Sequence, residues 1–194
     1  MVVKRFFVNK PLAEYLKINR ERLDASPSYR AECFDRIFPS TVFKGTNQSP
    51  TIRWIYNRCA DGRAVVTPRD VLDLLIRAKQ RQQDICAADP EAASDSIIGP
   101  MAIQYGFEEL SKRKRQTYLQ AEFPHLWKDI EKFSGGKTDY NSSALQTLLG
   151  VGWKTIVENL LDVGFFSKRT RKSEIVYSIP FLYRHGMNLT QGMA

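Results

Sequence analysis

A short basic run near the C-terminus holds the side chains with the clearest chemistry in this chain. Four of the five residues at 168–172 are cationic: Lys168, Arg169, Arg171 and Lys172. Lysine and arginine at this density can bind the phosphates of nucleic acid, which adds affinity without reading the base sequence. The alternative interpretation is a solvated hairpin tip that stays polar so that the ribbon does not aggregate. We expect this run to bind duplex DNA weakly, and we expect salt to weaken the binding further.

A second group of polar residues precedes this run at helical spacing. Lys154, Thr155 and Asn159 are expected on the outward side of a helix, where side chains can enter the major groove of DNA. Glu158 and Asp162 share that side, and phosphates repel carboxylates. Binding of nucleic acid and binding of a protein partner therefore both stay open for this helix.

Two helices are expected to position these residues. Asn141-Ser142-Ser143 supplies side chains that cap a helix, and Ser143 has the spacing of a capping box with Gln146. Gly150-Val151-Gly152 breaks this helix, because glycine adopts backbone angles that other residues avoid. A second helix over 153–163 has apolar residues at i, i+3, i+4, i+7 and i+8. Its first apolar residue, Trp153, is expected to be the buried anchor.

A β-ribbon is expected after the second helix. Gly164 is a suitable residue to close that helix. The apolar pair Phe165-Phe166 and the alternation at 175–179 predict two short strands, with the basic run as the loop between them. Helix, turn, helix and ribbon in this order predict a winged helix-turn-helix, whose ribbon can contact phosphates.

The rest of the chain predicts a mainly α-helical protein. Apolar periodicity and capping residues indicate six further helices, at about 12–23, 29–37, 51–59, 67–83, 101–122 and 124–133. We expect a helical lobe at 1–85, a linker at 86–100, and a long helix plus winged helix at 101–194. The basic cluster at 112–115 is interpreted as a solvated helix face.

Composition narrows the class of protein. The net charge of +8 over 194 residues favours acidic partners such as nucleic acid. Three cysteines without Cys-x-x-Cys spacing, and two distant histidines, favour neither a disulfide framework nor a zinc site. No run of 18 apolar residues occurs, so no membrane span is expected. We expect a reduced, cytoplasmic protein without a cofactor.

Motifs for catalysis are missing from the sequence. Gly136-Lys137-Thr138 resembles the end of a Walker A motif, but Glu131 occupies the position that needs glycine. The chain has neither Walker A nor Walker B, and it has no nucleophile elbow, His-Glu-x-x-His motif or dinucleotide fingerprint. We therefore expect no independent enzyme and no ATP hydrolysis by this chain.

Several short motifs resemble the region that follows the catalytic core in a group of bacterial P-loop ATPases related to the AAA and STAND superfamily. They cover most of the chain from about Phe34 onward: Cys-Phe-Asp-Arg-Ile-Phe-Pro at 33–39, Trp-Ile at 54–55, Asp-Gly at 61–62, Thr-Pro-Arg-Asp-Val-Leu-Asp-Leu-Leu at 67–75, Val-Gly-Phe-Phe at 163–166 and Ile-Pro-Phe-Leu-Tyr-Arg-His-Gly-Met at 179–187. In that superfamily a helical lid follows the core, and a winged helix often follows the lid.

The resemblance implies a non-catalytic C-terminal module with regulatory or nucleic-acid-binding function, which has an ATPase core or another protein as a partner. It also implies that Arg69, after Pro68, is a sensor 2 arginine that reaches the nucleotide; the alternative is an ordinary first-turn arginine. Two other functions stay open for the whole chain. One is a protein-interaction scaffold that uses the winged helix, and the other is a stand-alone DNA-binding transcriptional regulator.

Overall fold

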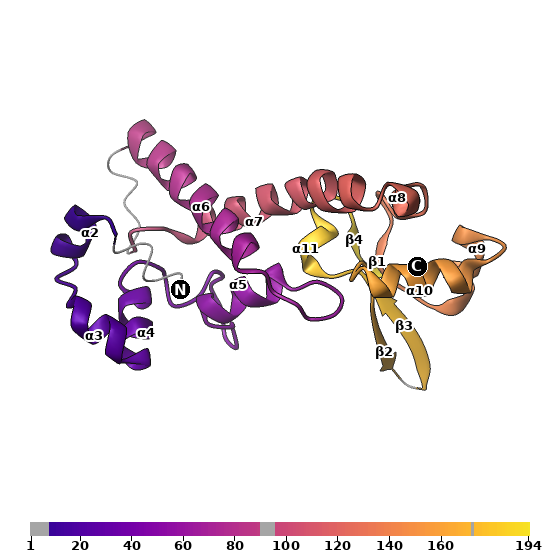
Figure 1. Ribbon diagram of the computed structural model, residues 1–194, viewed down its shortest axis with the longest axis horizontal. Helices are drawn as coiled ribbons and strands as arrows, with labels where there is room; N and C mark the ends of the chain where they lie inside the picture. Colours follow the sequence, from indigo (N-terminus) through magenta and orange to yellow (C-terminus); the bar gives the residue numbers. More distant parts are fainter. Residues whose placement is uncertain (1–7, 90–95, 172) are drawn as a thin grey trace. The chain divides into compact units, whose positions relative to one another are not determined.

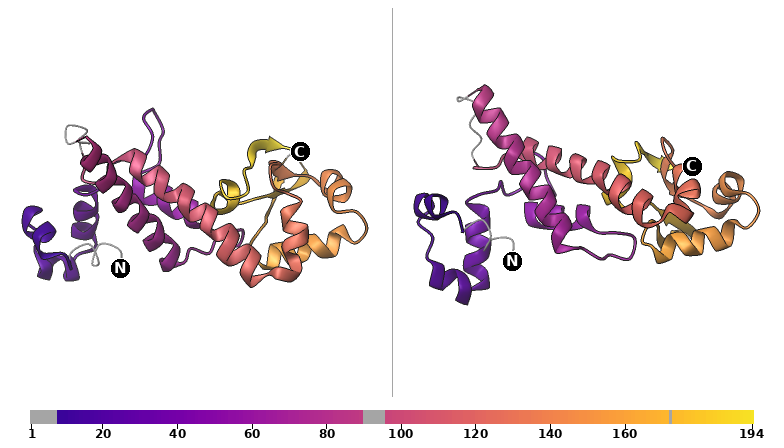
Figure 2. Two further views of the ribbon diagram at one scale, coloured as in Figure 1. Left: turned by 90° about the horizontal axis from the view of Figure 1, so that it is seen from above. Right: turned by 45° about the horizontal axis from the view of Figure 1, so that its top comes forward.

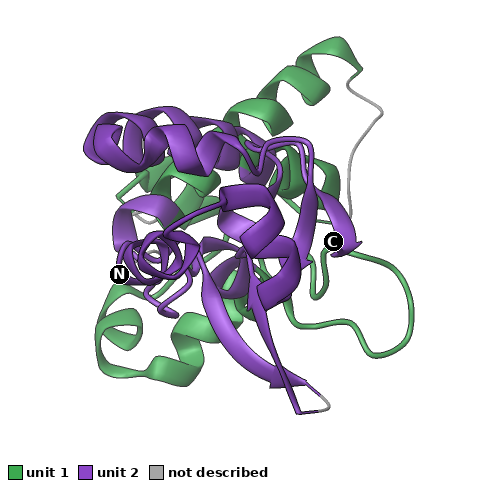
Figure 3. Cartoon of the chain, turned by 90° about the vertical axis from the view of Figure 1, so that its right-hand side faces the viewer, with its two compact units in different colours: residues 1–54, 71–106 green, residues 55–70, 107–194 purple. Residues whose placement is uncertain are grey.

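The computed structural model describes residues 8–89, 96–171 and 173–194 (Figure 1). Most of these residues are helical, and a small four-stranded sheet forms from segments in the C-terminal part of the chain. The prediction of a mainly α-helical protein is confirmed. The chain forms two compact units: unit 1 comprises residues 1–54 and 71–106, and unit 2 comprises residues 55–70 and 107–194 (Figure 3).

This division differs from the predicted one, which placed a linker at 86–100 between two lobes. The boundaries between the units fall inside three helices: α5 (Thr51–Cys59), α6 (Pro68–Ala88) and α7 (Pro100–Lys114). Both ends of the predicted linker are helical, since α6 extends to Ala88 and α7 begins at Pro100. The middle of that segment, at 90–95, lies outside the described residues.

Unit 1 opens with three short helices: α2 (Lys10–Tyr15), α3 (Arg20–Ala25) and α4 (Pro27–Asp35). The prediction of one helix over 12–23 is wrong. Lys17 has a φ of 51°, which interrupts the helix, and the side chain of Asn19 accepts a hydrogen bond that starts α3. Short polar caps therefore outweigh the apolar periodicity in this segment.

The buried apolar side chains of unit 1 come mainly from α4, the segment that follows α4, α6 and α7. Phe34 and Phe38 stack with ring centroids 4.3 Å apart. Gly106 of α7 lets that helix lie against α6, because a Cβ there would be 2.5 Å from the carbonyl oxygen of Leu74. A side chain at this position would therefore separate the two helices.

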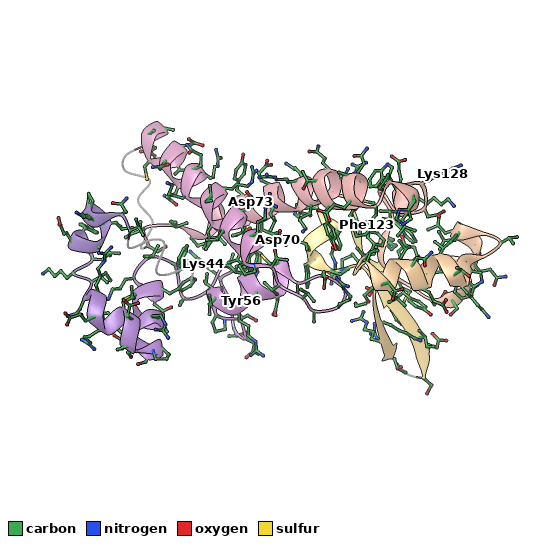
Figure 4. All side chains as sticks on the ribbon, in the orientation of Figure 1. Lys44, Tyr56, Asp70, Asp73, Phe123 and Lys128 are labelled. Carbon is green, nitrogen blue, oxygen red and sulfur yellow. The ribbon has the colours of Figure 1, made fainter. Side chains whose placement is uncertain are left out.

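Helix α5 has the predicted bounds, but its buried side differs from the prediction. Trp54 and Ile55 are buried as expected. Ile52 and Tyr56, which the periodicity places inward, are exposed, and Tyr56 is labelled in Figure 4. The buried stripe of this helix is therefore narrower than its apolar sequence suggests.

The start of α6 is confirmed. The hydroxyl of Thr67 accepts a hydrogen bond from the backbone N–H of Asp70 at 3.1 Å, as expected of an N-cap residue. Pro68 is the first helical residue, where its missing N–H costs nothing. Asp70 is buried in the first turn (Figure 4).

Unit 2 contains the second half of the predicted long helix. The helix that begins as α7 continues as a π-helical segment, η1 (Arg115–Gln120), and the short helix α8 (Pro124–Glu131) follows it (Figure 2). Both predicted helices, at 101–122 and from Pro124, are confirmed. The π-helical segment was not expected from the sequence. None of the helices that the structure describes is long and apolar enough to cross a membrane.

The predicted pair of helices near the C-terminus is present as α9 (Ser142–Leu149) and α10 (Trp153–Asp162). The capping box at Ser143 is wrong, because the side chain of Asn141 caps α9 by accepting from Ala144 N at 2.9 Å. Between the helices, Gly150 and Gly152 have φ values of 76° and 80°, which glycine adopts without strain.

The anchor of α10 also differs from the prediction. Trp153 is half-buried, whereas Val157 and Leu160 are buried. A residue in the first turn of a helix lies at the edge of the packed face, so the interior is filled by side chains one and two turns later.

The sheet has the strand order β2-β3-β1-β4. The ribbon of β2 (Ser167–Arg171) and β3 (Glu174–Ser178) is antiparallel, as predicted, and Ser167 is paired with Ser178. Strands β1 (Lys137–Tyr140) and β4 (Thr190–Met193) were not predicted; β1 pairs antiparallel with β3 and parallel with β4. The short helix α11 (Phe181–Arg184) lies between β3 and β4 in the sequence.

An aromatic cluster fills the interior of unit 2. The ring of Phe133 lies 5.1–5.6 Å from the rings of Tyr140, Phe165 and Phe166. The turn at Gly62 packs on the same segment, since Gly62 N donates to Gly164 O at 2.7 Å. These contacts pack the segment between α10 and β2 into the interior of unit 2.

Candidate nucleic-acid interface

The predicted basic loop is a strand. Lys168, Arg169 and Arg171 belong to β2 itself, so their prediction as loop residues is wrong. Strand β2 ends at Arg171 and β3 begins at Glu174, and Lys172 lies outside the described residues. Successive side chains of a strand point to opposite faces, so Lys168 lies on one face of β2, and Arg169 and Arg171 lie on the other.

Arg169 is held by a carboxylate on the neighbouring part of the sheet. Its Nη2 lies 2.7 Å from Oδ1 of Asp139 in β1. The hydroxyl of Ser178 donates to the same carboxylate oxygen, and the hydroxyl of Thr138 donates to the other oxygen at 3.0 Å. Arg169 therefore ties β2 to β1, and its charge is partly neutralised within the protein.

Two cations of β2 are more open. Lys168 is exposed and is paired across the ribbon with Tyr177. Arg171 is exposed and directly opposite Glu174, whose carboxylate reduces the local positive charge. Unlike Arg171, which faces a carboxylate, Lys168 is paired across the ribbon with an uncharged residue.

The outward side of α10 has the residues that the periodicity predicted. Lys154, Thr155 and Asn159 are exposed, and so are Glu158 and Asp162. Two carboxylates and one ammonium group leave this side with a small negative charge. The helix is therefore less suited than the ribbon to approach a phosphate backbone.

The other basic cluster, at 112–115, is not a uniformly solvated face. Lys114 is 13% exposed and forms an ion pair with Asp70 at 3.2 Å. Its ammonium group also lies 4.2 Å from the ring centroid of Tyr118. Arg115 stacks over Trp127 at 5.5 Å. This part of the prediction is wrong, because the first turn of α6 supplies a buried carboxylate, Asp70, that the sequence around Lys114 does not reveal.

Two further predicted positions lie apart from the ribbon in the sequence. Arg69 is exposed in the first turn of α6, beside buried Asp70. Gly136-Lys137-Thr138 leads into strand β1 and follows helix α8. A Walker A motif has the opposite order, a strand before the loop and a helix after it.

Buried ionisable groups of unit 2 are poor candidates for catalysis. The pKa of the Cys59 thiol is raised to about 12, chiefly by burial and also by nearby Asp70, whereas Lys114 acts to lower it. Burial also raises the pKa of Tyr183 well above its ordinary value. A nucleophilic cysteine needs a lowered pKa, so Cys59 has the properties of a structural thiol.

The sequence did not reveal the residue that partly neutralises the charge of the ribbon. Asp139 lies in a strand that has only four residues, of which the first three are polar, so no periodicity marks it. Asp139 is separated from Arg169 by 30 positions, and only the sheet pairing brings the two side chains together. The sequence therefore indicated the cations of the ribbon but not the carboxylate that neutralises one of them.

Comparison with known proteins gives no relative for this chain. No protein-family model, no curated protein and no solved structure matches it. The function of the ribbon therefore has to be inferred from the chemistry of its own residues.

Proposed function

We propose that this chain binds duplex DNA weakly and without sequence preference through the β2–β3 ribbon. In this proposal α9 and α10 are the helices of a winged helix-turn-helix, and the ribbon is its wing. The observation that carries it is the exposure of Lys168 and Arg171 on the edge strand of a narrow ribbon. Such side chains can reach phosphates without burying the rest of the protein surface.

The charges around the ribbon predict modest affinity. Arg169 is engaged by Asp139, and Arg171 faces Glu174, so few cations remain to release counterions from DNA. Glu158 and Asp162 disfavour deep entry of α10 into the major groove. We therefore expect a dissociation constant in the micromolar range or weaker, as is typical of non-specific contacts.

Fluorescence anisotropy with a labelled duplex tests the proposal. The variant Lys168→Ala/Arg171→Ala should bind roughly 10-fold more weakly at low salt, with a salt slope smaller by about two units. A matched control removes two exposed lysines elsewhere, Lys44→Ala/Lys128→Ala (Figure 4). The control should retain the affinity of the wild type to within about twofold. Equal losses in both variants would mean that net charge, and not the ribbon, determines the binding.

A protein partner is the second candidate for the same surface. The edge strand β2 has one side of its backbone without a neighbouring strand among the described residues. Such an edge can pair with an extended segment of another protein. If neither the wild type nor the ribbon variant binds DNA at low salt, this second function replaces the first. A sequence-specific regulator would instead prefer one duplex over others by at least about 10³-fold.

The association with a P-loop ATPase is a proposal from the sequence motifs. We propose a non-catalytic role for this chain, with exposed Arg69 directed to the nucleotide of a partner core. Calorimetric titration with Mg-ATP should then detect no stoichiometric site tighter than about 10 µM in the chain alone. A tighter site would contradict the non-catalytic assignment.

A further inference from the structure

Unit 1 contains a cavity of about 440 Å³ that has no part in DNA binding by the ribbon. Its described lining residues all belong to unit 1, and they lie on α6, at the start of α2, directly after α4 and directly before α7. A cavity of this size falls in the range that holds a small organic ligand. The chemistry of its walls indicates which class of ligand fits.

One face of α6 forms a wall of the cavity. The lining residues of this helix run from Leu72 to Cys86 and recur every three or four positions, which places them on one side of the helix. The first three of them are apolar: Leu72, Leu75 and Ile76. The later ones carry polar groups or a thiol: Lys79, Gln82, Gln83 and Cys86. This wall therefore changes from apolar to polar along the helix.

The other walls are mostly apolar. They are formed by Leu12 of α2, by Ile37 after α4, and by Ile97 and Ile98 before α7. Ile37 and Ile98 are buried, so they present a fixed apolar surface to the cavity. A ligand with an alkyl body would gain most of its binding free energy by leaving water for these walls.

Hydrogen bonds hold the walls together before any ligand binds. The backbone N–H of Ile98 donates to the carbonyl oxygen of Ile37 at 2.9 Å, and the N–H of Gly99 donates to Oε1 of Gln82 at 2.8 Å. Gln82 is buried, and its Nε2 lies 3.5 Å from Sγ of Cys86. The segment at 97–99 is thus tied both to α6 and to the chain after α4. A preformed cavity lowers the cost of ordering on binding.

The charge of the lining is positive. Lys79 is the one lysine or arginine among the described lining residues, and none of these is an aspartate or a glutamate. Lys79 is exposed, and no carboxylate of the described chain forms an ion pair with it. An anionic group beside Lys79 would therefore meet an attractive charge without a competing carboxylate in the lining.

We propose that this cavity binds a small amphiphilic monocarboxylate, with its carboxylate at Lys79 and its alkyl chain against the apolar walls. A single ammonium group compensates a single negative charge, so a monoanion suits the lining better than a phosphate does. A medium-chain fatty acid has this chemistry. The site lies in unit 1 and does not depend on DNA binding by Lys168 and Arg171 of unit 2.

Calorimetric titration with decanoate at constant ionic strength tests the site. The wild type should bind one equivalent with a dissociation constant on the order of 0.1 mM. Octanoate is shorter by two methylene groups and should bind about 10-fold more weakly, because less apolar surface is buried. Equal affinity for the two acids would mean that charge alone holds the ligand, and it would overturn the proposal.

A charge placed at the cavity tests its location. Ile76 is 61% exposed, so Ile76→Glu should leave the fold intact while it repels the carboxylate and removes part of the apolar wall. We expect decanoate to bind this variant about 10-fold more weakly or worse. The matched control Met101→Glu adds the same charge at an exposed apolar residue of unit 1 outside the cavity lining. It should bind like the wild type, and equal losses in the two variants would contradict the site.

A second pair of variants tests the position of the carboxylate. Lys79→Gln should weaken decanoate binding about threefold, as expected for an exposed ion pair. Lys44→Gln removes an exposed lysine of unit 1 outside the lining and should have no effect. If circular dichroism shows that Ile76→Glu does not fold, this pair takes its place. Unchanged affinity in Lys79→Gln would contradict the proposed contact.

Cys86 provides a local measurement, because it lines the cavity and is exposed, whereas Cys33 and Cys59 are buried. Saturating decanoate should slow the reaction of Cys86 with a disulfide reagent severalfold, since the bound ligand covers the thiol. An unchanged rate would place the ligand outside the cavity.

Two further outcomes would overturn the site. One is an absence of saturable decanoate binding by the wild type. The other is self-association, measured by sedimentation, that Ile76→Glu abolishes and decanoate does not affect, because a second copy of the chain would then cover the cavity. Decanoate binding that persists in Lys168→Ala/Arg171→Ala supports the site even if the ribbon proves not to bind DNA.

Discussion

The two basic clusters of this chain look alike in the sequence but differ in the structure. Cluster A is Lys112-Arg113-Lys114-Arg115, and cluster B is Lys168-Arg169-Thr170-Arg171, to which Lys172 is adjacent. In cluster A, Lys114 is nearly buried against Asp70. In cluster B, Lys168 and Arg171 are exposed and Arg169 has a partner on the sheet.

This difference shows that a run of charges has no fixed role. A lysine on a helix becomes part of the interior when another segment places a carboxylate beside it, and the pair then resists disruption because each charge alone would be costly to bury. A lysine on an edge strand has solvent on one side and remains available to a ligand. The following experiments measure how far the two clusters differ.

The largest expected difference is in thiol reactivity beside cluster A. Cys59 is fully buried next to Asp70 and Lys114, with a pKa of about 12, whereas Cys86 is exposed. At pH 8 the thiolate fraction of Cys59 should be about 10³-fold below that of an ordinary thiol with a pKa of about 8.5. Labelling with a disulfide reagent should therefore modify Cys86 rapidly and Cys59 only after unfolding. Rapid modification of Cys59 in the native protein would mean that cluster A is open.

Ionisation of the same thiol should make the stability of the fold depend on pH. Below about pH 8.5 the Cys59 thiol is protonated in both the folded and the unfolded chain. Above that pH the unfolded chain ionises, while the native thiol stays protonated up to about pH 12, so stability falls as pH rises through this window. The loss at pH 10 should be about 2 kcal/mol from this group. Cys59→Ser should lack this component when urea unfolding is compared at pH 8 and pH 10.

Lys114→Ala should have the largest effect on stability within the two clusters. It leaves the carboxylate of Asp70 buried without its partner, which should lower the free energy of unfolding by about 3–5 kcal/mol. Urea unfolding measures this loss. Lys168→Ala in cluster B should change the free energy of unfolding by less than about 0.5 kcal/mol. The double variant Asp70→Asn/Lys114→Met should recover part of the loss. A loss below about 1 kcal/mol for Lys114→Ala would show that the pair is solvated.

Gly62→Ala should have an intermediate effect on stability, because Gly62 packs on the segment that precedes cluster B. A Cβ at this position would collide with the carbonyl oxygen of Phe166, directly before β2. The backbone must shift, so we expect a loss of about 1–3 kcal/mol in thermal or urea unfolding. As a control, Gly135→Ala meets no atom within 4 Å and carries only the cost of its φ of 74°. Equal losses in the two variants would mean that the turn is not packed on this segment.

Arg169→Ala should have the smallest effect on stability. Arg169 is about half exposed, and Asp139 keeps its bonds from Thr138 and Ser178, so we expect a loss of at most about 1 kcal/mol. Lys168→Ala/Arg171→Ala should be neutral within about 0.5 kcal/mol. Urea unfolding of both variants gives the comparison. A larger loss in the double variant would mean that Lys168 and Arg171 have structural partners.

Helices with strong local signals could be predicted from the sequence. Thr67 and Pro68 mark the start of α6, and the glycines at 150 and 152 mark the turn between α9 and α10. These features depend on neighbours within four residues, so tertiary contacts add little to them. The break at Lys17 escaped prediction because the same segment also has the apolar spacing of one longer helix.

The strands at the centre and far edge of the sheet could not be predicted. β1 and β4 have four residues each, too few to show an alternation, and they pair with each other across about 50 positions. Their hydrogen bonds become available only when the chain between them has folded. The partner of Arg169 depends on that pairing, so it was hidden for the same reason.

The sequence by itself determined the helical class, the caps and turns, and the location of the cationic runs, because these follow from residue type and short spacing. Tertiary structure alone decided which cations are available. It placed Asp70 beside Lys114 and Asp139 beside Arg169. Electrostatic energy depends on the distance between charges and on their exclusion from water, and neither quantity is set until distant segments meet.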